Sequence, residues 1–287
     1  MAAPRVWLIT GASAGLGLEL AKVAANRGDR VIAASRSPKK LDGLKGIKAA
    51  RLDHNEPPES VQASIKDIIA IYGTVDIVVN NAGYVQTGTV EETTPEETQR
   101  QFQANTFGPI NVYRAILPHL RSEGSGTLVT VGSMAAWYPM NSCNLYNASK
   151  AALRWLAIGL AEEIKPFGIK HCLIEPGFFR TDLLKPDANL AKTSTQTRIA
   201  DYAQINKDAD NAFANFHGTQ LGHPAKGAEI MYDVITSTGI AAGRDLPSLL
   251  PLGSDANTEL TKSSQGTIDQ VKEWAEIAAQ SDYPEGE

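Results

Sequence analysis

Residues 6–35 read VWLITGASAGLGLELAKVAANRGDRVIAAS, and this stretch decides the fold. An apolar run rich in β-forming residues (6–10) leads into a glycine-rich turn, then an amphipathic helix, then a second apolar run (31–35). Strand, turn, helix and strand within about 30 residues are typical of a βαβ unit. The glycines of the turn, Gly11, Gly15 and Gly17, let backbone N–H groups approach a pyrophosphate at the positive end of the helix. The stretch therefore predicts an α/β domain that binds a nucleotide.

The end of the second strand indicates which nucleotide binds. A unit that prefers NAD usually carries an acid there, which holds the ribose hydroxyls. This chain has Ser35-Arg36-Ser37 instead, and Arg36 is placed to pair with a 2′-phosphate through charge-assisted hydrogen bonds. NADP (NADPH) is therefore favoured over NAD. The alternative interpretation is a solvated basic loop, since Lys39 and Lys40 follow closely.

Composition excludes several classes of protein. With 287 residues, 43% of them hydrophobic and 21% charged, the chain is an ordinary globular protein that can bury a core. A net charge of -5 gives no basic surface for nucleic acid. Two cysteines and five scattered histidines lack the spacing of a disulfide framework or a metal site, so we expect no metal. The sequence shows neither an export signal nor a membrane span, and we expect a cytoplasmic location.

Apolar strand-like runs and helical patterns alternate along the rest of the chain. We predict strands at 48–53, 75–79, 126–132, 170–174 and 246–253, and helices at 60–72, 148–164 and 267–279, with another that opens at Thr94-Pro95. No low-complexity linker divides the chain. The pattern predicts a single domain (1–287) with a doubly wound α/β fold, a largely parallel sheet and helices on both faces. In such sheets ligands bind outside the carboxyl ends of the strands.

A second group of residues suggests catalysis. Ser133 follows a predicted strand, and Tyr146 and Lys150 stand at i and i+4, on the same face of a helix. A lysine ammonium near a phenol favours the phenolate, so we expect the tyrosine pKa to fall from about 10 towards the working range of an acid/base catalyst. A serine hydroxyl nearby can hydrogen-bond a substrate carbonyl. Taken alone, however, a Tyr-x-x-x-Lys pattern is common on helices.

The ordered set of motifs resembles the short-chain dehydrogenase/reductase family over roughly residues 5–255. The set is T-G-x-x-x-G-x-G, then N-N-A-G at 80–83, a helical Asn105, Ser133, Y-x-x-x-K, and Pro176-Gly177. The resemblance implies a Rossmann fold and a catalytic set of Asn105, Ser133, Tyr146 and Lys150. In such enzymes the tyrosine exchanges a proton with the carbonyl oxygen and the lysine lowers the tyrosine pKa and holds the nicotinamide ribose. The serine polarises the carbonyl, and the asparagine supports a water in a proton relay.

The resemblance also implies the residues that contact the cofactor. Asp53 falls at the adenine side, Thr181 at the carboxamide, and the asparagine-rich segment beside the adenosine ribose. The full expected set is Gly11, Ser13, Gly15, Leu16, Gly17, Arg36, Asp53, Asn81, Ala82, Gly83, Tyr146, Lys150, Pro176, Gly177 and Thr181.

The least regular segment, 183–222, is expected to form the substrate lid, as the corresponding segment does in this family. The alternative interpretation is a surface insertion packed down by its aromatic residues. The expected pocket walls are Trp137, Tyr138, Met140, Asn141, Cys143, Phe178 and Phe179, which suggest an apolar or aromatic substrate. Residues 257–287 are expected to form a helical tail. The Phe178-Phe179 loop and this tail are more similar to retinol- or steroid-type members than to sugar or acyl reductases.

The predicted function is an NADP(H)-dependent oxidoreductase that moves hydride between nicotinamide and a ketone, aldehyde or secondary alcohol, in the reductive direction. The expected partner is a small carbonyl or alcohol substrate, and family members suggest a homodimer or homotetramer. Two alternatives stay open: a protein of the same fold that performs a non-redox reaction such as a cyclisation, and a non-catalytic nucleotide-binding or sensor protein.

Overall fold

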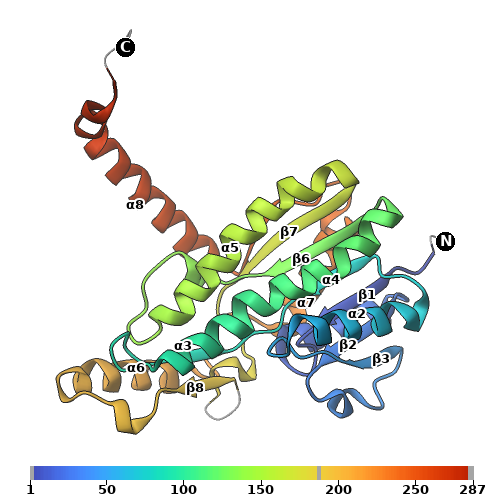
Figure 1. Ribbon diagram of the computed structural model, residues 1–287, viewed down its shortest axis with the longest axis horizontal. Coiled ribbons are helices and arrows are strands. Elements are labelled where there is room, and N and C mark those ends of the chain that lie inside the picture. Colours follow the sequence, from blue (N-terminus) through green and yellow to red (C-terminus); the bar gives the residue numbers. More distant parts are fainter. Residues whose placement is uncertain (1–2, 186–188, 284–287) are drawn as a thin grey trace.

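The computed structural model describes residues 3–185 and 189–283. Strands and helices alternate along most of the chain (Figure 1). The strands are β1 (Val6–Thr10), β2 (Arg30–Ser35), β3 (Ile47–Arg51), β4 (Ile77–Asn80), β5 (Val85–Thr87), β6 (Gly126–Val131), β7 (Ile169–Pro176), β8 (Leu190–Lys192) and β9 (Leu249–Leu252). The helices are α1 (Gly15–Asn26), α2 (Pro58–Tyr72), α3 (Pro95–Phe102), α4 (Gly108–Glu123), α5 (Asn144–Ile164), α6 (Ala203–Phe216), α7 (Pro224–Thr236) and α8 (Ser254–Ala278), with short 3-10 turns between some of them.

Seven strands form one parallel sheet in the order β3-β2-β1-β4-β6-β7-β9. The order reverses beside β1, which pairs with β2 on one side and β4 on the other. Every pairing in this sheet is parallel, so the carboxyl ends of all the strands meet at one edge. The predicted doubly wound α/β fold is confirmed. The last strand, β9, lies at the sheet edge, where Pro251 costs no hydrogen bond to a further strand.

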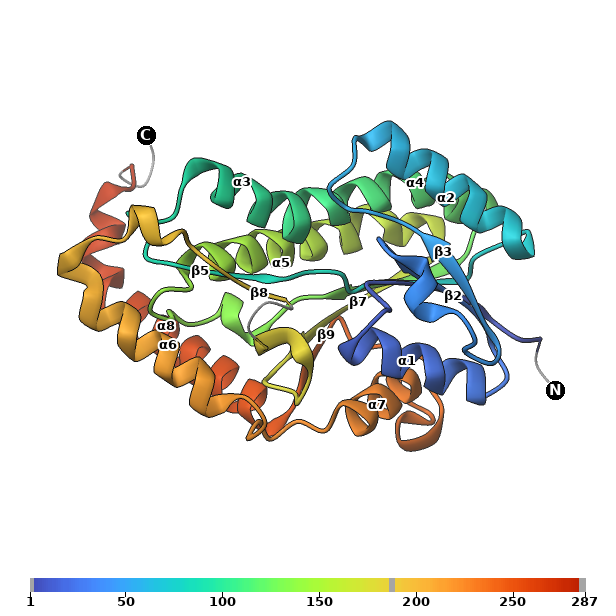
Figure 2. The same cartoon turned by 90° about the horizontal axis from the view of Figure 1, so that it is seen from below.

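Helices cover both faces of the sheet, as Figure 2 shows: α1 and α7 on one face, α2, α4 and α5 on the other. The central strand β1 is apolar on both sides because it is buried on both. Trp7 and Ile9 join the core beneath α1 and α7, and Val6 and Leu8 join the core beneath α2 and α4. The ring of Trp7 stacks on Tyr232 of α7 at a centroid distance of 5.5 Å.

The helix predicted to open at Thr94-Pro95 begins there, with a capping box between Thr94 and Glu97. It is less regular than expected, because a π-helical segment, Gln103–Phe107, separates α3 from α4. Single π turns inside helices are frequent at functional sites, and this one carries Asn105. The chain also continues as helix past Pro118, which lies inside α4.

The predicted last helix and the expected lid differ in detail from the structure. The last helix, α8, begins at Ser254 instead of residue 267, because the Asp255 carboxylate accepts hydrogen bonds from the backbone N–H groups of Ala256 and Phe178 and ties the helix start to the loop after β7. The expected lid contains β8, paired in parallel with β5, and α6. Residues 186–188 of the expected lid and 284–287 of the expected tail lie outside the described residues.

Candidate active site

A cavity of about 1530 Å³ lies at the carboxyl ends of the strands. Its walls come from the glycine turn, the segments after β2, β3, β4 and β6, the start of α5, the loop after β7 and strand β8. All the expected cofactor residues except Gly17 line this cavity, together with Ser133. Segments that are far apart in the sequence therefore meet at one site.

The glycine turn and the asparagine-rich segment are built against each other. Gly11 has φ +63°, and a Cβ there would stand 2.7 Å from the Cα of Ala82. The Thr10 hydroxyl accepts hydrogen bonds from the backbone N–H groups of Asn81 (3.0 Å) and Ala82 (3.1 Å). Gly17 does not line the cavity but packs against this segment, since a Cβ there would come within 2.4 Å of the Asn81 amide nitrogen. The two motifs thus fix one another's position.

The start of α1 is suited to an anion. Its N-cap residue, Ala14, makes no side-chain cap, and the first turn carries no acid. The first backbone N–H groups of the helix therefore point out of its positive end without a side-chain acceptor from these residues. Ser13, Ala14, Gly15 and Leu16 all line the cavity, so a phosphate can reach this helix end.

The end of the cavity next to β2 and β3 carries both cationic and anionic side chains. Arg36, directly after β2, is exposed, and it lines the wall with Lys40. Asp53 lines the same end, and its carboxylate accepts hydrogen bonds from the backbone and side-chain nitrogens of Asn55, both at 3.0 Å. His54, which the sequence analysis did not single out, is buried beside Asp53, and burial lowers its pKa to about 4.

The expected catalytic residues Ser133, Tyr146 and Lys150 meet on one wall. Tyr146 and Lys150 lie one turn apart on α5 and are nearly buried. The Lys150 ammonium donates a hydrogen bond to the carbonyl of Val131 at 3.0 Å, at the end of β6. Ser133 follows two residues later and caps a short turn by accepting from the Ala135 N–H at 3.1 Å. This wall carries a phenol, an ammonium and a hydroxyl.

The expected lowering of the tyrosine pKa does not occur in the free protein. Burial raises the pKa of Tyr146 to about 12, and a hydrogen bond with the Ser133 hydroxyl opposes part of the rise. Burial lowers the pKa of Lys150 to about 8, and the charge of Glu175 opposes this change. The prediction from helical spacing was wrong in sign because removing the phenolate from water outweighs any attraction to the lysine.

Asn105 has a structural position behind the cavity, and its side chain is fully buried. Its amide nitrogen donates to the carbonyl of Tyr84 (3.0 Å) and to the Ser149 hydroxyl (3.1 Å). Its amide oxygen accepts from the Tyr84 N–H at 3.1 Å. Asn105 thus joins the segment after β4 to the catalytic helix, between Tyr146 and Lys150.

Five of the expected pocket walls do not line the cavity: Trp137, Tyr138, Met140, Asn141 and Cys143. Trp137 and Tyr138 pack against the base of α8. Met140 and Cys143 pack behind Tyr146, and burial raises the pKa of the Cys143 thiol to about 12. Asn141 is exposed. Only Phe178 and Phe179 of the expected set line the cavity.

Glu175 explains the position of Trp137. This glutamate is fully buried at the end of β7, where its carboxylate accepts from the Trp137 indole N–H at 2.6 Å and lies 3.6 Å from the Arg154 guanidinium. Burial raises the pKa of Glu175 to about 6, although Trp137, Arg154 and Lys150 oppose the rise. A single acid in an apolar strand, directly before Pro176, was the sequence signal for this residue.

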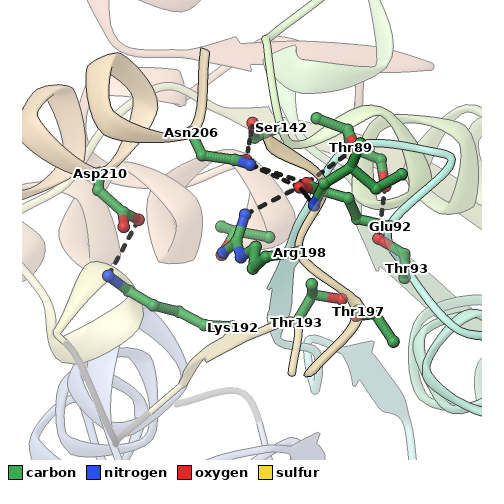
Figure 3. Close-up of polar contacts among 12 residues, drawn as sticks. Thr89, Glu92, Thr93, Ser142, Lys192, Thr193, Thr197, Arg198, Asn206 and Asp210 are labelled. Carbon is green, nitrogen blue, oxygen red and sulfur yellow. Dashed lines mark hydrogen bonds and ion pairs between the residues drawn. The ribbon is translucent and has the colours of Figure 1, made fainter. Parts of the chain in front are cut away.

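The first residues of the segment 189–216 line one side of the cavity. Asn189, Leu190, Ala191 and Lys192 line it, and Lys192 forms an ion pair with Asp210 of α6 at 2.9 Å. Figure 3 shows the polar contacts that hold this segment, centred on Glu92. The sequence analysis did not single out Glu92, because two glutamates in a threonine-rich loop resemble a solvated turn. On the other side, Phe216 packs edge-on against Phe178 at 4.7 Å.

Within residues 3–185 and 189–283, no three His, Cys, Asp or Glu side chains are placed to hold a metal ion. No helix among these residues is both long enough and apolar enough to cross a membrane.

Comparison with known proteins gives the family. A family model described as short chain dehydrogenase matches residues 5–190. The chain is 30% identical over 285 residues to the oxidoreductase BOA17 of Botryotinia fuckeliana (strain B05.10), covering 96% of this chain and 99% of that protein. It is 32% identical over 200 residues to a 3-ketodihydrosphingosine reductase of Bacteroides thetaiotaomicron, covering 70% and 72% of the two chains.

A short-chain dehydrogenase from Streptomyces avermitilis has a similar solved structure, with a TM-score of 0.85, 33% identity, and coverage of 99% of this chain and 100% of that one. Structures of this fold have been determined with NAD and with NADP, so a nicotinamide cofactor is typical of it. With its motifs gathered around one cavity at the switch point of a parallel sheet, the chain belongs to the short-chain dehydrogenase/reductase family of oxidoreductases.

Proposed function

We propose that this oxidoreductase uses NADPH to reduce a ketone or aldehyde to an alcohol, with Tyr146 as the proton donor. One observation carries the proposal: the glycine turn, Arg36 and the wall of Ser133, Tyr146 and Lys150 all line the same cavity. A dinucleotide cofactor needs an anion-binding turn at one end and reacting groups at the other. This cavity offers backbone N–H groups at the turn and reacting side chains on the wall.

The residues present fit such a cofactor. A side chain at Gly11 would collide with Ala82, so glycine there lets the turn pack against the segment after β4 and keeps both at the cavity wall. Gly15 and Leu16 with the start of α1 would hold the pyrophosphate, and Arg36 the 2′-phosphate. When bound, the nicotinamide supplies the hydride, and the protein supplies orientation and proton transfer.

The protonation states of the wall support the reductive direction. With a pKa of about 12, the Tyr146 phenol keeps its proton at neutral pH and can donate it to the carbonyl oxygen. Ser133 can donate a hydrogen bond to the same oxygen, which develops negative charge. Lys150, protonated below its pKa of about 8, carries a positive charge on the same wall, which would favour the phenolate as the phenol gives up its proton. Lys150 would also hold the nicotinamide ribose.

The substrate class follows from the rest of the lining. Phe178, Phe179, Leu183 and Leu190 make this part of the wall apolar, which suits a mainly apolar carbonyl compound. The relative from Bacteroides thetaiotaomicron is named as a reductase of a ketone, which agrees with this proposal. An assay of NADPH consumption with a panel of aliphatic and aromatic ketones tests it. Product formation without NADPH consumption would contradict it in favour of a non-redox reaction.

The cofactor preference has its own test, Arg36→Asp. We expect this change to raise the KM for NADPH by about tenfold or more and to leave the KM for NADH nearly unchanged, because a charge-assisted contact with the 2′-phosphate becomes a repulsion. Steady-state kinetics with each cofactor measure both constants. Lys39→Asp is the matched control, since Lys39 is an exposed cation nearby that does not line the cavity. Equal effects of both changes on the two cofactors would contradict a specific role for Arg36.

A further inference from the structure

Glu92 lies at the centre of a polar network that joins the segment after β5 to the segment after β8 (Figure 3). Its carboxylate is completely buried. It accepts hydrogen bonds from the Thr89 hydroxyl (2.9 Å), the backbone N–H of Ile199 (2.9 Å) and the Asn206 amide (2.8 Å to each oxygen). The guanidinium of Arg198 lies 3.3 Å away and pairs with its charge. A buried carboxylate persists only when it is satisfied in this way.

The charge of Glu92 is therefore a fixed feature of the protein near neutral pH. Burial acts to raise the pKa of Glu92, but the hydrogen bonds from Ile199, Asn206 and Thr89, together with the charge of Arg198, outweigh it and lower the pKa to about 2. The Glu92 carboxylate therefore stays ionised and bound to its donors, and it does not titrate in the working pH range of the enzyme.

Apart from Thr89, the donors come from the segment 189–216. Arg198 and Ile199 follow β8, whose residues line the cavity, and Asn206 belongs to α6. Glu97, at the start of α3, reinforces the same attachment: it accepts hydrogen bonds from the Ser194 N–H at 3.2 Å and from the Thr193 hydroxyl. The two buried glutamates of the segment after β5, Glu92 and Glu97, thus attach 193–206 to that segment.

Asn206 extends the network to the catalytic helix. Its amide oxygen accepts from the Ser142 hydroxyl at 3.2 Å, while the Ser142 carbonyl accepts from the Gly88 N–H at 2.8 Å. Ser142 has φ +56°, a left-handed conformation that a residue with a side chain adopts only when its surroundings hold it. It lies four residues before Tyr146, and α5 begins at Asn144.

Residues of β5, β8 and the loop before α5 also form the apolar surroundings of Tyr146. Tyr146 packs in one apolar cluster with Val85 of β5, Cys143 and Leu190 of β8. The Glu92 network holds β8 and the loop before α5 in one arrangement, and each contributes a residue, Leu190 and Cys143, to the apolar cluster around the tyrosine. A displacement of the segment 189–216 would therefore reach Tyr146 by two routes, through Leu190 and through Ser142.

We propose that Glu92 is a positioning residue, which joins the segment 189–216 to the loop before the catalytic helix and so sets both the substrate wall and the place of Tyr146. The expected effect of Glu92 on turnover rests on the proposed function. Its expected effect on the structure does not. The residues that bond to the Glu92 carboxylate do not line the cavity that holds the glycine turn and Arg36, so we expect the affinity for NADPH to change less than the KM for the ketone.

The test is Glu92→Gln, which keeps the size of the side chain and removes its charge. The amide nitrogen it introduces would face the donors of Asn206 and Arg198. We expect the backbone amide of Ile199 to exchange with deuterium about tenfold faster or more, because its acceptor is weakened. We expect the KM for the ketone to rise by about tenfold with a smaller fall in kcat, and the affinity for NADPH to stay within about twofold.

Glu91→Gln is the matched control, since Glu91 is an exposed neighbour with one hydrogen bond, to the Tyr202 hydroxyl at 2.8 Å. It should leave the Ile199 exchange rate and the KM near their wild-type values. Asn206→Ala provides a second variant that keeps the contact between Glu92 and Ile199 but cuts the link to Ser142, and it should lower kcat.

Wild-type exchange at Ile199 and a wild-type KM in Glu92→Gln would overturn the proposal. A loss of NADPH affinity equal to the rise in KM would also overturn it, since that indicates general unfolding of the site. Because amide exchange is measured without substrate, it separates a failure of this inference from a failure of the proposed reaction.

Discussion

The expected pH dependence comes from the wall of Ser133, Tyr146 and Lys150, where Lys150 has its pKa close to physiological pH. Its pKa is lowered to about 8 by burial, so the ammonium exists below this value and is lost above it. We therefore expect kcat/KM for ketone reduction to fall as the pH rises through about 8. Initial rates across this range at subsaturating ketone measure it.

Lys150→Arg is the natural companion measurement, because a guanidinium keeps its charge across the whole range. If this variant retains activity, its profile should lose the fall near pH 8. A wild-type profile that stays flat to about pH 10 would contradict the role of the lysine charge, since an unperturbed lysine titrates only near that value.

Single residues also mark where sequence reasoning succeeds and fails. The spacing of Tyr146 and Lys150 predicts correctly that both belong to one helix and line one cavity. It does not predict the sign of the tyrosine pKa shift, because that depends on burial, which is a property of the whole fold. The sequence analysis also missed Glu175 and Glu92, because their partners, Trp137 and Asn206, are distant in sequence and only the fold brings them together.

Among the elements, those with strong local signals were predictable. The β1-α1-β2 unit and the start of α3 follow from glycine positions, apolar period and capping residues. The π-helical segment at Asn105 has no such signal, because it arises from the fit between α3, α4 and the catalytic helix. The segment 137–143 was misplaced because its aromatic residues suit a pocket wall and a helix contact equally well, and α8 provides the contact.

The outer part of α8 gives a prediction at the level of the element. From Gly266 onward every described side chain is exposed, including Val271 (65%), Trp274 (58%) and Ile277 (58%). Figure 1 shows this part projecting from the body of the molecule. Ending the chain after Gly266 should therefore shift Tm by less than about 2 °C in dilute solution, because few contacts within the chain are lost.

Calorimetry or circular dichroism on the full and shortened chains at two concentrations gives the comparison. A larger loss of Tm that grows with protein concentration would contradict this expectation. It would show instead that the apolar stripe is buried in a homo-oligomer, whose stability depends on concentration.

For the whole molecule, the seven-stranded parallel sheet and its helical layers were predictable because the alternation of elements leaves few arrangements. The cavity at the carboxyl ends follows from the same topology. The substrate wall was not predictable, because 189–216 is held by contacts with residues about a hundred positions earlier, such as Glu92 with Ile199 and Glu97 with Ser194. The pattern of side chains along the sequence does not predict such distant pairs.

The central claim is that Tyr146 delivers the proton in a reduction that consumes NADPH. The most direct test is the rate of NADPH oxidation coupled to alcohol formation, measured with one reactive ketone on the wild-type, Tyr146→Phe and Tyr138→Phe proteins. Tyr138 is the control because it packs against α8 and does not line the cavity. We predict that Tyr146→Phe lowers kcat by about 10²–10⁴-fold and that Tyr138→Phe stays within about twofold of wild type. Wild-type turnover by Tyr146→Phe would contradict the account.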